Sequence, residues 1–140
     1  MSEQSLFIDT GAFLAFLMPG DQYEEPAKKS WKLIEQNHYP LLSSEFILVE
    51  TANFLLRQQS SRIASAWLDS MMDSKEIRLI HVEREDFRVA TAFAKKYSDL
   101  RISMTDALSF ALMKRQKVQR AFTFDKHFEF AGFEIWPGDL

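Results

Sequence analysis

The sequence predicts an α/β fold built on a mostly parallel sheet. Short apolar runs typical of strands alternate with longer segments whose apolar residues recur every three to four positions, as on one face of a helix. Such alternation is typical of parallel sheets that helices cover on both faces. With 140 residues, of which 46% are hydrophobic, the chain is long enough for one core, and we expect a single domain over residues 1–140.

Five segments are expected to form strands. The first covers residues 6–10, an apolar run that ends in Asp9 and Thr10. The other four are short, and they cover residues 40–43, 77–82, 121–124 and 133–136. Groups that bind a ligand in an open parallel sheet lie beyond the carboxyl ends of its strands. An acid at the end of the first strand is therefore a candidate for chemistry.

Helical patterns fill the segments between these strands. We expect helices over residues 11–18, 21–37, 45–59, about 63–71, 87–97 and 103–117, and a short helical turn before Gly132. Ser43 or Ser44 can cap the helix that begins at Glu45. A short extended piece, residues 100–102, is expected to precede the helix over 103–117.

Composition excludes several kinds of site. The chain has no cysteine, so it has no disulfide, thiolate metal site or cysteine nucleophile. The four glycines form neither a phosphate-binding loop nor a dinucleotide motif. His38, His81 and His127 show no metal-ligand spacing, and each is expected to be a surface or packing residue. The net charge of −3 argues against a strongly basic protein, but cations that neutralise four carboxylates would bring it to about +1.

Neither a signal peptide nor a membrane segment is expected. Glu3 stands where a signal peptide has basic residues, and the longest apolar run, residues 12–18, is too short to cross a bilayer. We therefore expect a soluble, cytoplasmic protein.

Four acids occupy equivalent places, at a strand end or on the helix that follows: Asp9, Glu50, Asp106 and Asp125. Each also has a structural interpretation. Asp9 and Asp125 can cap the helices they precede, and Asp106 has the spacing of a capping box with Ser103. Glu50 can pair with a basic side chain or with a nearby asparagine. Their recurrence at equivalent places favours a common site.

A common site of four acids needs a cation. Two carboxylates about 4 Å apart repel each other by roughly 4 kcal/mol at an effective dielectric constant near 20. Oxygen ligands favour a hard ion, so one or two Mg²⁺ or Mn²⁺ ions are expected. Such ions activate water and neutralise a phosphodiester during its hydrolysis. The acids are then metal ligands.

Four motifs around these acids occur together in one order. They are residues 8–13 (IDTGAF), 44–51 (SEFILVET), 104–112 (MTDALSFAL), and 123–128 (TFDKHF) followed by Gly132 and Phe133. In this respect the sequence resembles the PIN-domain ribonucleases, and specifically the VapC-like toxins of toxin–antitoxin systems. The resemblance covers essentially the whole chain.

The resemblance implies a Rossmann-like three-layer α/β/α fold and a Mg²⁺- or Mn²⁺-dependent endoribonuclease. It implies that the metal ligands and catalytic residues are Asp9, Glu50, Asp106 and Asp125. The side chains that could orient these acids or contact phosphate are Thr10, Thr105, Thr123 and Lys126. Members of the family commonly form homodimers and are silenced by a cognate antitoxin, which predicts both kinds of partner besides RNA.

Several basic side chains could hold the RNA backbone. The candidates are Arg57, Arg62, Lys114, Arg115, Lys117, Arg120 and Lys126. Lys126 is the one expected near the site, because it follows Asp125.

Three other functions are compatible with parts of the pattern. A signalling receiver domain shares the fold class and an acidic Mg²⁺ pocket, but it needs a phosphoacceptor aspartate at the end of the third strand, where residues 77–82 lead into Glu83 instead. A non-catalytic interaction domain would have no reason to keep all four acids. A PIN-fold nuclease without an antitoxin keeps every feature of the sequence.

Overall fold

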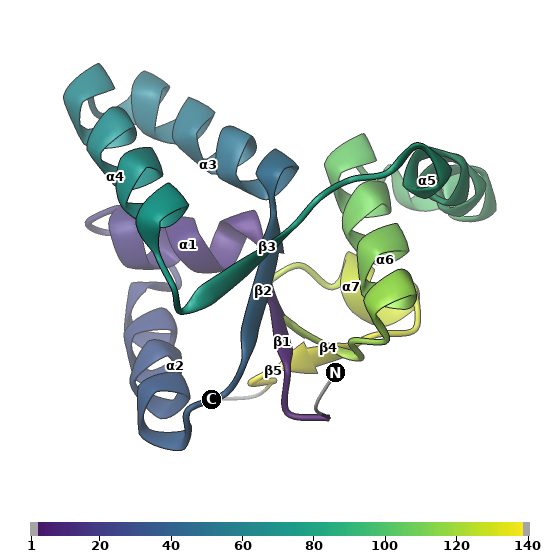
Figure 1. The fold of residues 1–140 in the computed structure, drawn as a ribbon, viewed down its shortest axis with the longest axis horizontal. Coiled ribbons are helices and arrows are strands. Elements are labelled where there is room, and N and C mark those ends of the chain that lie inside the picture. The colour runs from purple at the N-terminus through teal and green to yellow at the C-terminus, as the bar shows by residue number, and fades with distance from the viewer. Residues whose placement is uncertain (1–2, 139–140) are drawn as a thin grey trace.

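A five-stranded, all-parallel sheet lies between two layers of helices in the computed structural model, which describes residues 3–138 (Figure 1). The strands lie in the order β3-β2-β1-β4-β5. They are β1 (Leu6–Ile8), β2 (Leu41–Ser44), β3 (Ile77–Ile80), β4 (Arg120–Phe122) and β5 (Glu134–Trp136). The predicted three-layer α/β/α fold is confirmed.

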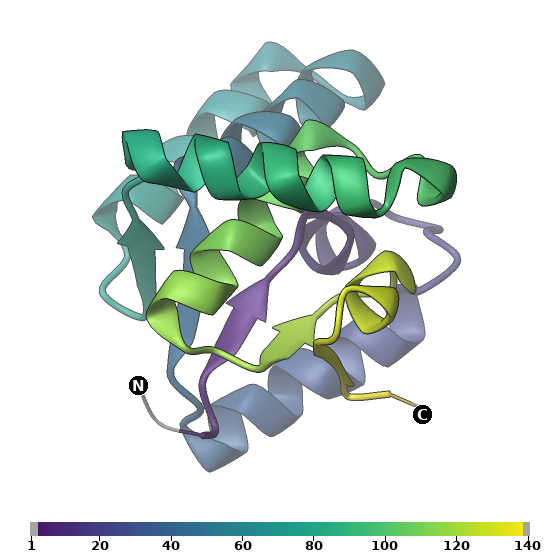
Figure 2. The same cartoon turned by 90° about the vertical axis from the view of Figure 1, so that its right-hand side faces the viewer.

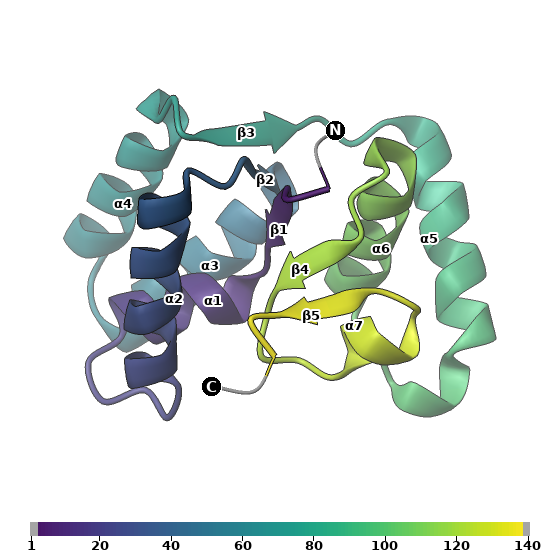
Figure 3. The same ribbon diagram turned by 90° about the horizontal axis from the view of Figure 1, so that it is seen from below.

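Helices from the two halves of the chain cover opposite faces of the sheet (Figures 1 and 3). One layer contains α1 (Thr10–Leu17), α2 (Glu24–Asn37), α3 (Glu45–Gln58) and α4 (Ser61–Asp73). The other contains α5 (Arg84–Lys96), α6 (Met104–Gln116) and the one-turn α7 (His127–Phe130), and Figure 2 looks onto this layer. Within residues 3–138, no helix combines the length and the apolar character that a membrane span requires.

The central strand is apolar because it is covered on both faces. Leu6, Phe7 and Ile8 of β1 have no exposed surface, as expected for a strand inside a parallel sheet. On one face, Phe13 of α1 packs in the same core as β1. On the other, Phe110 of α6 meets the ring of Phe128 edge-on, with ring centroids 4.9 Å apart. Burial of such side chains contributes roughly 1.5–3 kcal/mol each.

Several boundaries differ from the prediction by one to three residues; for example, the first strand ends at Ile8 and α5 begins at Arg84. Residues 100–102 are not extended, because Ser98–Leu100 form a 3₁₀ helix and Arg101 has a left-handed φ of 53°. A three-residue segment is too short for hydrophobic periodicity to separate these states. The strand predicted over 121–124 ends at Phe122, and in the loop beyond it the Thr123 hydroxyl accepts a hydrogen bond from the Asp125 amide.

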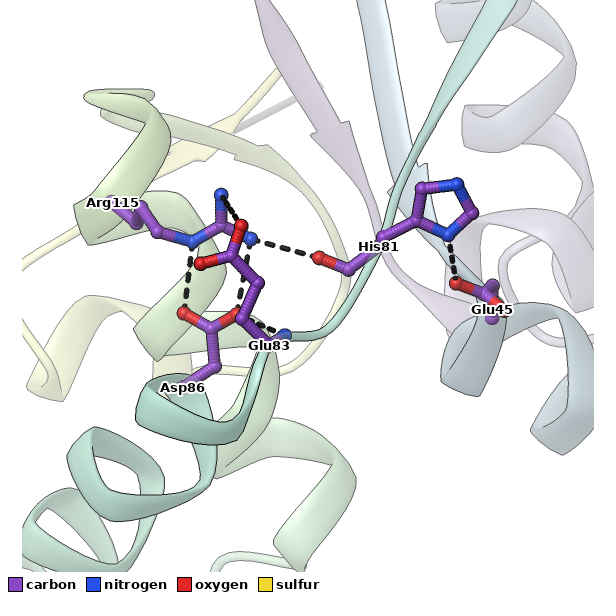
Figure 4. A network of polar contacts seen from close by, with 5 residues as sticks. All are labelled: Glu45, His81, Glu83, Asp86 and Arg115. Atoms are coloured by element: carbon purple, nitrogen blue, oxygen red, sulfur yellow. Dashed lines mark hydrogen bonds and ion pairs between the residues drawn. The ribbon is translucent and has the colours of Figure 1, made fainter.

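A polar network joins the end of β3 to helices of both layers (Figure 4). The guanidinium of Arg115, on α6, donates to both carboxylate oxygens of Asp86 on α5, at 2.9 and 3.0 Å, and to the carbonyl of His81 at 2.8 Å. The His81 side chain points away from Arg115, and its Nδ1 atom lies 2.8 Å from a carboxylate oxygen of Glu45 on α3. Burial would raise the pKa of Asp86, but the hydrogen bonds from Arg115 and from the Glu83 amide hold it below its usual value.

Arg115→Met is expected to lower the free energy of unfolding by about 2–4 kcal/mol, because it leaves the buried charge of Asp86 without its partner. Denaturant unfolding measures the loss. The matched control is Arg88→Met, since Arg88 pairs with Glu85 at the surface, where a pair contributes about 0–1 kcal/mol. Equal effects of the two substitutions would contradict a structural role for the Arg115–Asp86 pair.

Candidate functional site

The strand order brings the ends of three strands together. β1 lies between β2 and β4, and all three run in the same direction. Ile8 is paired with Phe122, so Asp9 and Thr123 follow at neighbouring positions on the same edge of the sheet. The Ser43 hydroxyl of β2 donates to the Ile8 carbonyl at 3.0 Å. The acid-bearing end of β1 is therefore held from both sides.

Thr123 connects two of the predicted acids. Its hydroxyl donates to the Asp9 carboxylate at 2.8 Å and accepts from the Asp125 amide at 3.0 Å. Asp9 and Thr123 are both buried. The capping interpretation of Asp9 is wrong, because its side chain makes no capping hydrogen bond to α1. The Asp9 carboxylate is oriented by Thr123 instead.

Asp106 enters the site from the first turn of α6. Its amide donates to the Ser103 hydroxyl at 3.0 Å, so the capping bond of this helix uses the backbone of Asp106 and leaves its carboxylate for other contacts. That carboxylate is largely buried, with 14% of the side chain exposed. Burial, followed by the charges of Asp125 and Glu50, raises the pKa of Asp106 to about 6.

Glu50 joins the group through its charge. It is half-buried on α3, and its charge contributes to the raised pKa of Asp106. Among residues 3–138 it has neither an ion-pair partner nor a hydrogen-bond partner for its side chain, so the predicted structural pairing of Glu50 is not found. Its closest electrostatic relation is to the other acids.

Asp9 is the most deeply buried of the four acids. Burial and the charge of Asp106 raise the pKa of Asp9 to about 7, Asp125 adds to this, and hydrogen bonds from Thr123 and from the Thr10 amide oppose it. The structure thus gathers negative charge that the protein itself does not neutralise. A hard divalent cation fits such a set of oxygen ligands.

His127 belongs to this site, which corrects the expectation that it is a surface or packing residue. Its Nδ1 atom lies 3.3 Å from the Asp125 carboxylate and 3.8 Å from that of Asp106. One ligand atom from each of these three residues lies within 4.8 Å of the others. The sequence signal for this placement was that His127 follows Asp125 by two residues. At this spacing the amide of His127 donates to the Asp125 carboxylate at 2.9 Å, which turns the chain and brings the two side chains together.

The remaining predicted residues have mixed placements. Thr10 is buried beside Asp9, and its hydroxyl has no hydrogen-bond partner among residues 3–138. Thr105 is half-buried on α6, next to Asp106. Lys126 is exposed where the chain enters α7.

Three of the candidates for phosphate contact have partners within the protein. Arg115 binds Asp86, as described above, and Arg120 donates to the carbonyl of Gln4 while it lies over the ring of Tyr39, 5.1 Å from the ring centroid. Arg57 lies over the ring of Phe54, on its own helix. The partners of Arg115 and Arg120 are distant in sequence, so sequence spacing does not reveal them.

A groove of about 940 Å³ lies away from the acids. Aromatic and aliphatic side chains of α1, α2 and α4 line it, among them Phe13, Trp31 and Trp67. None of the four acids contributes to this lining, so the groove and the acidic site are separate features.

Comparison with known proteins agrees with the geometry. The 23S rRNA-specific endonuclease VapC20 of Mycobacterium tuberculosis is 30% identical over 133 residues, which cover 94% of this chain and 98% of that protein. The crystal structure of VapC20, described as a sarcin–ricin loop cleaving toxin, superposes with a TM-score of 0.82 at 29% identity over 91% of this chain and 95% of that one.

More distant structures share the fold. VapBC2 of Rickettsia felis, bound to promoter DNA, has a TM-score of 0.70 at 10% identity and covers 94% of this chain and 96% of its own. A toxin–antitoxin complex of Klebsiella pneumoniae has a TM-score of 0.58 at 14% identity, with 86% and 87% covered. Residues 6–134 match the PIN domain. With the acids of β1, α3, α6 and the loop after β4 gathered at one edge of the sheet, this chain is a member of the PIN-domain family.

Proposed function

We propose that this protein is an endoribonuclease that depends on Mg²⁺ or Mn²⁺ and acts as the toxin of a toxin–antitoxin pair. The observation that carries the proposal is the convergence of Asp9, Asp106 and Asp125 at one edge of the sheet. The charge of Glu50 also acts on this group, because it raises the pKa of Asp106. The relative VapC20, which cleaves 23S rRNA, supports RNA as the substrate. The nuclease unit proposed is the whole chain, residues 1–140, and its proposed location is the cytoplasm.

Asp9, Glu50, Asp106 and Asp125 would hold one or two divalent ions. A bound ion supplies a nucleophilic water at neutral pH and offsets the charge that develops on the phosphodiester. Thr123 keeps the Asp9 carboxylate in place through its 2.8 Å hydrogen bond. Positioning of this kind contributes to catalysis because misplaced ligands cost affinity and rate.

Thr10, Thr105 and Lys126 are proposed to contact phosphate or to orient the acids. The support is strongest for Thr10, whose buried hydroxyl lacks a partner among the described residues. Leaving such a group unpaired costs about 1–3 kcal/mol, so a partner that arrives with metal or substrate would relieve that cost. Lys126 is exposed and charged, as a contact to the RNA backbone requires.

Of two alternative functions, a receiver domain is contradicted and a nuclease without an antitoxin is not. A receiver domain is contradicted by the family match and by β3, which ends at Ile80 and is followed by His81 rather than by an acid. A nuclease without an antitoxin differs only in its partner. Suppression of cleavage by a protein encoded beside this one distinguishes the two nuclease proposals.

The cleavage test uses purified wild type and Asp9→Asn on a hairpin with the sarcin–ricin loop sequence and on an unstructured RNA of equal length, with Mn²⁺, Mg²⁺ or EDTA. We expect metal-dependent cutting, reduced about 100-fold or more in Asp9→Asn because the side chain keeps its volume but loses a charged ligand. Asp69→Asn, which changes an exposed acid on α4, is the control. Cutting that persists equally in Asp9→Asn would place the activity elsewhere.

Metal-free Asp106→Asn is expected to be more stable than the wild type by roughly 1–2 kcal/mol at pH 8, with a difference that shrinks steadily as pH falls toward 4. The pKa values of Asp9, about 7, and Asp106, about 6, lie above the ordinary value. The folded state therefore retains protons that the unfolded chain has released, and the wild type loses stability as pH rises through about 4 to 7. The asparagine removes part of that loss.

Denaturant unfolding in EDTA at several pH values measures this difference. Mn²⁺ added at pH 8 should restore more stability to the wild type than to Asp106→Asn, because only the wild type keeps the full ligand set. A variant less stable than the wild type at pH 8 would contradict repulsion among the acids as the main effect of the Asp106 charge.

We further propose that the protein forms a homodimer through α3. Phe46, Val49 and Leu56 lie along one side of this helix and are 39%, 54% and 48% exposed. Phe87 of α5, also exposed, meets Phe46 edge-on and extends the patch. A second copy would remove this apolar surface from water.

Val49→Asp is expected to convert the dimer to a monomer, because it introduces a charge at the centre of the patch. Light scattering after size exclusion gives the mass. Gln58→Glu is the control, since it adds the same charge to α3 at an exposed polar position on the other side of the helix. A wild type that is monomeric at micromolar concentration would overturn the proposal.

A further inference from the structure

The imidazole of His127 stands at the acidic site without a partner of its own. No surface of Nδ1 reaches solvent, and this atom makes no hydrogen bond within residues 3–138. Its two nearest charged neighbours, Asp125 at 3.3 Å and Asp106 at 3.8 Å, do not have hydrogen-bond geometry relative to it. A buried ring nitrogen that faces two carboxylates without a hydrogen bond to either leaves room for a cation shared by all three groups.

The spacing of these atoms suits a shared cation. Ligand atoms about 2.1 Å from one ion are about 3.0 Å apart when they are at right angles and about 4.2 Å apart when they are opposite. The distances of 3.3 and 3.8 Å from Nδ1 fall inside that range, and one atom from each residue lies within 4.8 Å of the others. The imidazole needs no large movement to join the two carboxylates around one ion.

We propose that His127 is a metal ligand through Nδ1, so that one ion at this site has a mixed nitrogen and oxygen ligand set from His127, Asp106 and Asp125. The inference rests on the proposed metal-dependent function and adds a residue and a metal preference to it. Imidazole favours transition metals, whereas Mg²⁺ takes oxygen ligands. The site therefore favours Mn²⁺ over Mg²⁺. Asp9 and Glu50 contribute only oxygen ligands.

The backbone supports this role. Asp125 accepts a hydrogen bond from the His127 amide with the same oxygen that lies 3.3 Å from Nδ1. This bond fixes the two side chains relative to each other at the start of α7. Phe128, the next residue, is fully buried against Phe110 of α6, the helix that carries Asp106. The histidine is therefore anchored to the element that supplies its second neighbour.

The test is electron spin echo spectroscopy of Mn²⁺ bound to the untagged, full chain, in a buffer without nitrogen ligands. We expect a ¹⁴N coupling typical of imidazole in the wild type, and its loss in His127→Gln. Labelling the unmutated protein with ¹⁵N-histidine should change the same signal, which makes the test independent of any substitution. His38→Asn is the matched control, because His38 is exposed at the end of α2 and its left-handed φ of 54° suits asparagine.

Affinity gives a second readout. His127→Gln should weaken Mn²⁺ binding about 10-fold and Mg²⁺ binding about 3-fold or less, so that the preference for Mn²⁺ falls. Mn²⁺ that binds to the wild type without ¹⁴N coupling would overturn the role of His127 and leave the acidic metal site intact. A wild type that binds no Mn²⁺ would overturn the metal site of the proposed function as well.

Discussion

Mutual repulsion among buried carboxylates is the constraint on which this structure depends. Burial and the neighbouring acids raise the pKa values of Asp9 and Asp106. The folded state therefore disfavours the ionised forms of these two carboxyl groups. The acids come from different parts of the chain: Asp9 directly follows β1, Glu50 and Asp106 are on α3 and α6, and Asp125 lies in the loop after β4. Asp106 in particular stands at the start of α6, whose residues from Ala107 to Met113 are all buried. The fold must supply enough stability elsewhere to hold these charges together.

That stability comes from the hydrophobic core that joins the sheet to both helix layers, and a polar network beside it fixes how the helices pack. β1 is fully buried between the helix layers, and its neighbours β2 and β4 are paired to it in fixed register. The Arg115–Asp86 pair joins α6 to α5 at the opposite end of α6 from Asp106. A buried pair of this kind contributes specificity of packing more surely than net stability. Its place here is to fix α6 against its neighbours while the first turn carries an unbalanced charge.

The sequence was sufficient to predict the features that depend on residues close together along the chain. Strand and helix order follow from hydrophobic periodicity, and the four acids were found because each lies at a strand end or on the next helix. His127 was missed because spacing rules for metal sites look for repeated histidines or cysteines, and here a single histidine joins acids from α6 and from the loop after β4. The structural partners of Arg115 and Arg120 could not be predicted for a similar reason, since Asp86 and Gln4 are distant from them in sequence. Three-residue segments such as Ser98–Leu100 carry too little pattern to classify.

The acids differ in how firmly they are held, and this difference has a consequence for metal binding. Asp9 is buried and fixed by Thr123, and Asp106 belongs to a buried helix. The side chains of Asp125 and His127 are about one-third exposed and lie at the entrance to a helix of four residues. A cation placed between carboxylates that repel each other draws them toward itself. In the proposed metal-bound state, the segment from Asp125 to His127 would therefore make most of any adjustment, while Asp9 and Asp106 would provide the fixed part of the site.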